Sequence, residues 1–147
     1  MKLLLTIAVI TVTFAAFSQS SSRVVSTKKA TPFDCEFKEN VNRNGDTTYM
    51  VTLTFRDITY TQLEEYGFIT ISNNEDLTAF RKGVSESIDL LGKDPKGTTR
   101  NVSGKVCSFE VKDGKYIVVR NSSGFCFLTK AQGTKLITWI DSIKFPA

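Results

Sequence analysis

Apolar and polar residues alternate along residues 33–41 and again along 49–55, which is the period of a β-strand with one buried face. The segment 42–46 between them reads Asn-Arg-Asn-Gly-Asp, and asparagine and glycine tolerate the positive φ of tight turns. These three segments therefore predict a β-hairpin. A third strand is predicted at 67–72, whereas residues 57–66 are ambiguous, because a strand-like start is followed by a run typical of a helical turn.

Apolar residues recur every three or four positions along residues 75–91, which predicts a helix with one buried stripe. Ser72 and Glu75 match the S/T-x-x-E/Q capping box that begins a helix, and Gly92 suits its end. The stripe consists of Leu77, Phe80, Val84, Ile88 and Leu91.

The second half of the chain repeats these patterns in a shorter form. Asp113-Gly114 predicts a two-residue hairpin, and Thr129 and Gln132 match a second capping box. The predicted elements are strands at 107–112, 115–120 and 125–129 and a helix at 131–143.

Two pairs of segments match each other between the halves. Residues 67–72, Gly-Phe-Ile-Thr-Ile-Ser, correspond to 124–129, Gly-Phe-Cys-Phe-Leu-Thr, and each is followed by a predicted helix. Upstream, Cys35-Glu36-Phe37 corresponds to Cys107-Ser108-Phe109. The residues predicted to be equivalent are Phe37 and Phe109, Phe68 and Phe125, and Ile71 and Leu128.

The chain is therefore predicted to be an α+β domain of two tandem strand-strand-strand-helix repeats related by a pseudo-twofold axis. One helix is expected to pack on the antiparallel sheet of each repeat. Because three strands alone bury little surface, the repeats are expected to share one core or to continue one sheet. The order of strands followed by a helix, given twice, resembles the repeats of PUR and Whirly nucleic-acid-binding proteins, and this resemblance implies a nucleic-acid ligand.

The N-terminal residues have the pattern of a signal peptide. Lys2 precedes an apolar run, and Ala16-Phe17-Ser18 is a small-x-small cleavage site, so residues 1–18 are expected to be removed and the mature protein to be secreted or periplasmic. A cut before glutamine resembles the secreted proteins of Bacteroidota-type bacteria. A membrane anchor is the alternative, but about 15 apolar residues are short for a span, which takes roughly 20.

The remaining chain is long enough for one domain with its own core. Residues 19–32 are rich in serine, threonine, lysine and arginine and are predicted to be a flexible leader. Within the single domain at 33–147, repeat one is expected at 33–92, a connection with proline and glycine at 93–104, and repeat two at 105–147.

Basic and acidic residues are distributed unevenly along a chain whose formal net charge is +4. Residues 19–92 hold 8 basic and 11 acidic side chains, whereas residues 93–147 hold 10 basic and 4 acidic ones. The second repeat is therefore expected to present a positive surface. The alternative is that these basic residues serve only solubility.

The sequence contains no histidine, which removes the commonest general base and the usual partner of a serine or cysteine nucleophile. Covalent catalysis, a bound metal and a cofactor are therefore not expected. The segment 42–46 lacks the acidic spacing of a calcium loop. The carboxylates weighed for a hydrolase lie mostly on predicted polar faces, at Glu36, Glu64, Glu65, Asp89 and Glu110.

Three cysteines leave at least one unpaired in an exported protein. The two-residue turn at 113–114 places Cys107 opposite Arg120 and puts Cys126 on the other face of the sheet, so these two cysteines are not expected to bridge. Cys35 and Cys107 occupy matching positions in the repeats and form a possible disulfide across the pseudo-twofold axis. The alternative is that all three cysteines are small buried apolar residues.

The leading expectation is an exported, non-catalytic module that binds another macromolecule, with the basic second repeat as its contact surface. One alternative is a carboxylate-dependent hydrolase, which would need two facing carboxylates in a cleft. The other is an anion- or nucleic-acid-binding protein of the repeated-sheet type, for which the basic contact residues are Lys112, Lys115, Arg120, Lys130 and Lys135.

Overall fold

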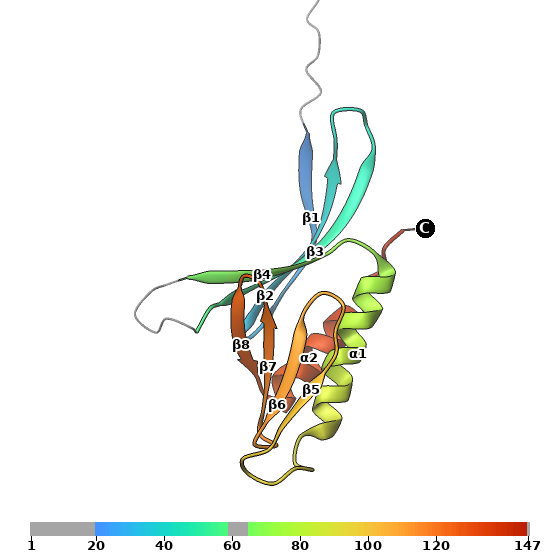
Figure 1. The fold of residues 1–147 in the computed structure, drawn as a ribbon. Helices are drawn as coiled ribbons and strands as arrows, with labels where there is room; N and C mark the ends of the chain where they lie inside the picture. Colours follow the sequence, from blue (N-terminus) through green and yellow to red (C-terminus); the bar gives the residue numbers. More distant parts are fainter. Residues whose placement is uncertain (1–19, 59–64, 147) are drawn as a thin grey trace, which may run out of the picture.

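The computed structural model describes residues 20–58 and 65–146, which form two four-stranded antiparallel sheets and two helices (Figure 1). The predicted α+β class and the tandem arrangement of two units are confirmed. The predicted signal peptide at 1–18 and residues 59–64 of the ambiguous stretch lie outside the described residues. The first unit comprises β1 (Ser21–Ala30), β2 (Phe33–Val41), β3 (Thr47–Arg56), β4 (Tyr66–Ile71) and α1 (Asn74–Leu90). The second comprises β5 (Thr99–Val102), β6 (Ser108–Lys112), β7 (Tyr116–Asn121), β8 (Gly124–Leu128) and α2 (Lys130–Ile140).

Each described sheet has one strand more than the sequence predicts. β1 occupies residues predicted to be a flexible leader, and it pairs with β2 from Ser21 opposite Val41 to Ala30 opposite Phe33. Only Ala30 of this strand is buried, which is why its composition resembles that of a linker. β5 lies in the predicted connection, pairs with β6, and buries only Val102. Edge strands that bury so little leave no hydrophobic period in the sequence.

The match between β4 and β8 holds in the structure. Ile71 and Leu128 are both completely buried in the core. Phe68 and Phe125 precede them by three positions and point to the opposite face of their sheets, as the alternation of a strand requires. The two units therefore continue from equivalent last strands into equivalent helices.

The Cys-x-Phe match does not hold in the structure. Cys35 lies in the same row of cross-strand neighbours as Ile69 in the first sheet, and Phe109 lies in the same row as Cys126 in the second. Ile69 and Cys126 occupy equivalent positions in the matched strands β4 and β8. Cys35 is therefore equivalent to Phe109. β2 has 9 residues and β6 has 5, so the same sequence motif falls at different heights in the two sheets. The predicted match is off by two residues, both for Cys35 with Cys107 and for Phe37 with Phe109.

Both predicted helices are present and begin with capping interactions. Thr129 accepts a hydrogen bond of 3.4 Å from the N–H of Gln132, and the Gln132 side chain accepts one of 2.8 Å from the N–H of Thr129, which confirms this capping box. The N-cap of α1 lies one residue later than predicted, because Asn73 rather than Ser72 accepts from the N–H of Asp76, over 2.8 Å, and the helix begins at Asn74 rather than at residue 75. Asparagine and serine are equally good caps, so residue preference alone does not choose between them.

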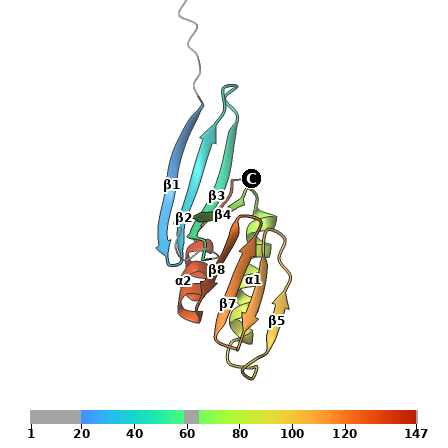
Figure 2. The same cartoon turned by 60° about the vertical axis from the view of Figure 1, so that its left-hand side comes forward.

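The main contacts between helices and strands cross from one unit to the other, as Figures 1 and 2 show: α1 packs on β5 and β6, and α2 lies against β1. The ring centroids of Phe80 in α1 and Phe109 in β6 are 5.6 Å apart. Gly83 allows this approach, because any side chain there would collide with the Phe109 ring. The indole N–H of Trp139 in α2 donates to the hydroxyl of Ser26 in β1 over 3.3 Å. The helices are thus exchanged between the units, and the two units share one hydrophobic core.

Candidate functional site

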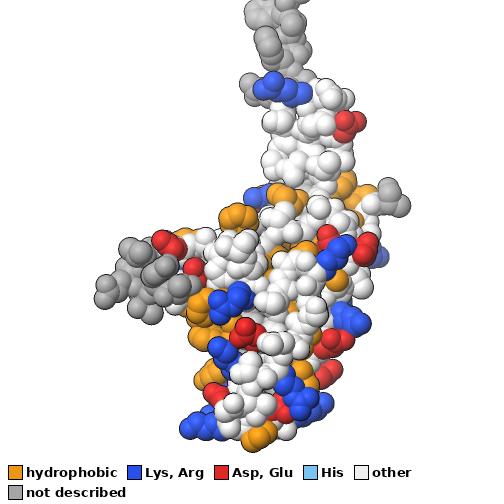
Figure 3. All heavy atoms as spheres, in the orientation of Figure 1, with side chains coloured by type: hydrophobic (Ala, Val, Ile, Leu, Met, Phe, Trp, Pro, Cys, Tyr) orange, Lys and Arg blue, Asp and Glu red, His pale blue; other side chains and the backbone are white. Residues whose placement is uncertain are grey.

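The outer face of the second sheet carries exposed aromatic side chains, whereas α1 packs on its inner face. Hydrophobic and basic side chains gather over β7 and β8 in Figure 3. Tyr116 and Phe127 are 47% and 45% exposed, and Tyr66 and Phe68 on the neighbouring strand β4 are 61% and 58% exposed. We call these four residues, together with Phe125 and Arg120, the aromatic band.

The register of β7 and β8 decides which side chains reach this face. Phe125 and Phe127 alternate with Cys126 and Leu128, which are buried in the core. Val118 pairs with Phe127 and points outward as well, yet it is completely buried, because larger side chains on both sides close over it. The aromatic band therefore rests on a packed base.

Three rings of the band, those of Tyr116, Phe125 and Phe127, contact one another at inclined angles. The centroids of Tyr116 and Phe127 are 6.0 Å apart with their planes inclined by 50°. Those of Phe125 and Phe127 are also 6.0 Å apart, with an inclination of 82°. The guanidinium carbon of Arg120 lies 4.5 Å from the centroid of the Phe125 ring, which is a cation–π contact. The band therefore presents ring edges as well as faces, beside a cation.

The two sheets meet at the turn between β7 and β8. The side-chain amide of Asn121 donates to the carbonyl oxygen of Phe68 over 2.7 Å, and the N–H of Phe68 donates to the hydroxyl of Ser123 over 2.9 Å. From the end of β3, the carboxylate of Asp57 accepts a hydrogen bond of 3.2 Å from the N–H of Phe125. These contacts hold the aromatic residues of β4 and β8 in a fixed relation.

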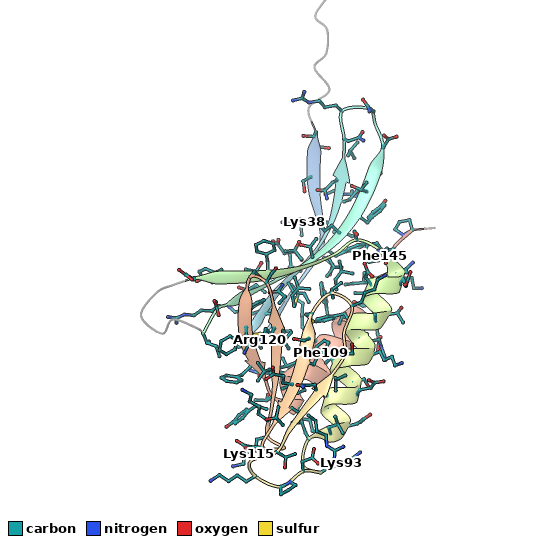
Figure 4. All side chains as sticks on the ribbon, in the orientation of Figure 1. Lys38, Lys93, Phe109, Lys115, Arg120 and Phe145 are labelled. Carbon is teal, nitrogen blue, oxygen red and sulfur yellow. The ribbon has the colours of Figure 1, made fainter. Side chains whose placement is uncertain are left out.

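The five basic residues that the sequence suggests as a contact surface do not lie on one face of the structure. Lys112, Lys115 and Arg120 lie on or beside the outer face of the second sheet, where Figure 4 labels Lys115 and Arg120, whereas Lys130 and Lys135 lie on α2 in the helix layer. Lys112 lies 3.7 Å from a carboxylate of its own strand. Within the described residues, Lys115 and Arg120 form no ion pair. The outer face therefore carries two uncompensated cations.

All three cysteines are buried free thiols, so the disulfide suggested between Cys35 and Cys107 is not formed. The register explains this, since Cys35 is equivalent to Phe109 and not to Cys107. Burial raises the pKa of Cys35 and the pKa of Cys107 to about 12. Burial also raises the pKa of Cys126, and the neighbouring Cys107 and Asp57 raise it further. Thiols in such surroundings are weak nucleophiles.

Cys107 and Cys126 both face the core, where the sequence predicts opposite faces. The turn between β6 and β7 has three residues, at 113–115, so that Lys112 pairs with Tyr116. A shift of one residue in register reverses the face to which each side chain points relative to its neighbouring strand. The prediction of a two-residue turn is therefore the origin of the error.

The hollow beside α1 does not bring two carboxylates face to face. An open hollow of about 480 Å³ lies between α1 and residues 101–105. Its only carboxylate among the described residues is that of Glu86, which pairs with Lys82 at 3.7 Å. In residues 20–58 and 65–146, no group of three or more cysteine, aspartate or glutamate side chains is placed to hold a metal ion.

The carboxylates weighed for a hydrolase are dispersed. Glu36 and Glu110 each pair with a lysine on the same strand, at 2.6 Å and 3.7 Å. Glu65 and Asp89 are exposed to solvent. Glu64 lies outside the described residues.

Comparisons of the chain with protein-family models, curated proteins and solved structures found no match. The likeness in element order to PUR and Whirly proteins is therefore not accompanied by a matching structure. Among the helices in the described residues, none combines the length and apolar character needed to cross a bilayer.

Sequence patterning does not identify the aromatic band. Residues 124–128 form an almost unbroken apolar run, which is typical of a strand buried on both faces. The outward orientation of Phe125 and Phe127 depends on which face of the sheet the helices cover, and periodicity does not determine this. Arg120 is the available indicator, because its pairing opposite Phe125 marks that row as outward-facing.

Proposed function

We propose that this protein is an exported, non-catalytic module that binds another macromolecule through the aromatic band. The observation that carries the proposal is the exposure of Tyr116 and Phe127 beside Arg120, on a face that no described helix covers. Large exposed apolar patches on soluble proteins commonly mark interaction sites. Aromatic and arginine side chains are enriched at the positions of interfaces that contribute most to binding.

Other features of the chain support the same proposal. The charge and apolar pattern of residues 1–18 supports export and a secreted or periplasmic location. The absence of histidine supports a role without acid–base or covalent catalysis. The excess of basic residues in the second unit supports a contact surface on that unit.

Affinity capture with two matched variants tests the proposal. Phe127→Ser removes an exposed ring from the band, whereas Val24→Ser removes an apolar side chain of similar exposure, 47%, from β1. Macromolecules captured from cells that produce the protein are compared for the wild type and both variants. We expect a ligand that the wild type and Val24→Ser retain and Phe127→Ser loses. Equal capture by all three proteins would contradict the proposal.

A second candidate is an anion- or nucleic-acid-binding protein. The observation that favours it is the position of Lys112, Lys115 and Arg120 on the same sheet face as the exposed rings. Single-stranded nucleic acids are bound by basic grooves whose aromatic side chains stack on the bases. Retention on heparin and on immobilised single-stranded DNA measures this activity. Elution by salt, at lower salt for Arg120→Gln, would favour it, and flow-through at about 50 mM salt would exclude it.

A further inference from the structure

We infer that the ligand of the aromatic band is a protein segment that carries carboxylates beside apolar side chains. The inference rests on the proposed function and narrows the class of ligand. Three properties of the band support it, namely the inclination of its rings, the small number of its free cations and the rigidity of its support.

The ring geometry of the band disfavours the stacking of nucleic-acid bases. Successive bases stack on aromatic faces that are open to them. The planes of Phe125 and Phe127 are inclined by 82°, and those of Tyr116 and Phe127 by 50°, so the three rings offer no common stacking plane. Arg120 also covers one face of the Phe125 ring. Inclined rings instead suit edge-to-face contact with aromatic or aliphatic side chains, as in protein cores.

The charges of the band suit a short acidic segment better than a polyanion. Arg120 and Lys115 form no ion pair within the described residues, while Lys112 already lies near a carboxylate. Proteins that bind nucleic acid strongly neutralise about 6 to 10 phosphates. Arg56, which is exposed and pairs opposite Tyr66, is a third cation without an ion pair among the described residues. The band therefore offers three uncompensated cations, well below that number, and Lys130 and Lys135 on α2 do not add to them.

Arg120 is placed to receive a carboxylate from a partner. Its guanidinium is held against the Phe125 ring at 4.5 Å, and its side chain is exposed. The N–H groups at the edge of a guanidinium match the two oxygens of a carboxylate and bind it in a bidentate manner. Phe127, which contacts the same ring, supplies apolar area beside this position.

The ordered structure beneath the band reduces the entropic cost of binding a partner. Val118 is fully buried beneath it, and Asn121 and Ser123 fix the backbone of Phe68. A surface that is already ordered loses little conformational entropy when a partner docks. A compact set of rings and one arginine can therefore act as the centre of a protein interface.

Selection of random peptides displayed on phage tests the inference on the immobilised folded protein. The wild type is compared with Arg120→Glu, Phe127→Ser and a control outside the band, Lys135→Glu. The wild type and Lys135→Glu should select sequences that place aspartate or glutamate next to aromatic or aliphatic residues. Arg120→Glu should select basic sequences instead. The best wild-type peptide, once synthesised, should bind Phe127→Ser roughly 30-fold more weakly, as expected for a central interface residue.

The possible outcomes separate the inference from the proposed function. Peptides without acidic preference, or the same peptides selected by Arg120→Glu, would overturn the inference. Binding of single-stranded oligothymidine that weakens in Phe127→Ser would also overturn it, while leaving the proposed function intact. If neither peptides nor oligothymidine distinguish the wild type from Phe127→Ser, both fail. Circular dichroism verifies folding, and Phe68→Ser replaces Phe127→Ser if that variant does not fold.

Discussion

The side-chain amide of Asn121 donates a hydrogen bond of 2.7 Å to the carbonyl oxygen of Phe68, and this contact joins β7 of the second unit to β4 of the first. The N–H of Phe68 donates to Ser123, so the same turn occupies both backbone groups of Phe68. β4 is an edge strand of its sheet, and unpaired backbone groups at an edge invite association with other chains. The turn of the second unit thus protects the first sheet and aligns the two parts of the aromatic band.

Removal of this contact should weaken the junction between the sheets. We expect Asn121→Ala to lower the free energy of unfolding by about 1 kcal/mol, the usual contribution of a hydrogen bond. The matched control is Asn101→Ala on β5, where the side chain is exposed and makes no hydrogen bond within the described residues. Urea denaturation measures both variants. Equal stability of the two would mean that the junction contributes nothing.

Phe109 should be costly to truncate, because its ring is completely buried between the second sheet and α1. Phe109→Ala is expected to lower the free energy of unfolding by about 3 to 5 kcal/mol. Phe68→Ala, at a position that is 58% exposed, is expected to cost about 0.5 kcal/mol or less. Similar losses in both variants would contradict the assignment of inner and outer faces.

The three thiols should be unreactive in the folded protein. Burial raises the pKa of Cys35 and the pKa of Cys107 to about 12, so almost no thiolate is present near pH 8. We expect a chromogenic disulfide reagent to label no cysteine in the native protein and three in denaturant. Rapid labelling of the native protein, or a disulfide found by non-reducing peptide mapping, would show that the burial or the pairing is different.

Two ion pairs at the helices should make stability depend on pH in the acidic range. Arg81 donates two hydrogen bonds to Asp141, at 2.5 Å and 3.0 Å, and these lower the pKa of Asp141 from 3.8. The side chain of Lys105 lowers the pKa of Asp76 in the same way. A carboxylate whose pKa is lower in the folded state stabilises the fold above its unfolded pKa, and this contribution is lost as the pH falls through the folded value.

Denaturation midpoints between about pH 6 and pH 2 measure this effect. The wild type should lose stability below about pH 4, and Asp141→Asn should lose less over the same interval. Asp89→Asn, an exposed carboxylate on α1, is the control and should follow the wild type. Because both side chains of the Arg81–Asp141 pair are exposed, added salt should reduce the difference. An unchanged acid profile in Asp141→Asn would show that the pair does not contribute.

The helices and the repeat could be predicted from the sequence because they are encoded by local signals. The capping residues Thr129 and Gln132 and the stripe of apolar positions act within one or two turns of a helix. β1 and β5 could not be predicted in this way, since their stability comes from pairing with a neighbouring strand rather than from burial. The register of β6 depended on one residue of turn length, which the Asp113-Gly114 pair did not determine.

The candidate site was less accessible to sequence reasoning than the fold. The sequence showed the positive charge of the second unit and predicted a helix that contains Lys135. It did not show that this helix lies away from the sheet face that carries Arg120. Phe125 and Phe127 belong to an apolar run that resembles a buried strand. Their outward orientation follows from the exchange of helices between the units, which places α1 on the inner face of the second sheet and is a property of the tertiary structure alone.

Site-specific photo-crosslinking tests most directly whether the aromatic band is the binding surface. A photoreactive phenylalanine analogue is incorporated in place of Tyr116, and for comparison in place of Val24, which has the same exposure of 47%. After irradiation of cells that produce each variant, crosslinked species are resolved and identified by mass spectrometry. We expect a discrete protein adduct from position 116 that is absent at position 24 and that disappears when Phe127→Ser is added. Adducts at position 24 alone, or adducts at position 116 that persist with Phe127→Ser, would contradict the account.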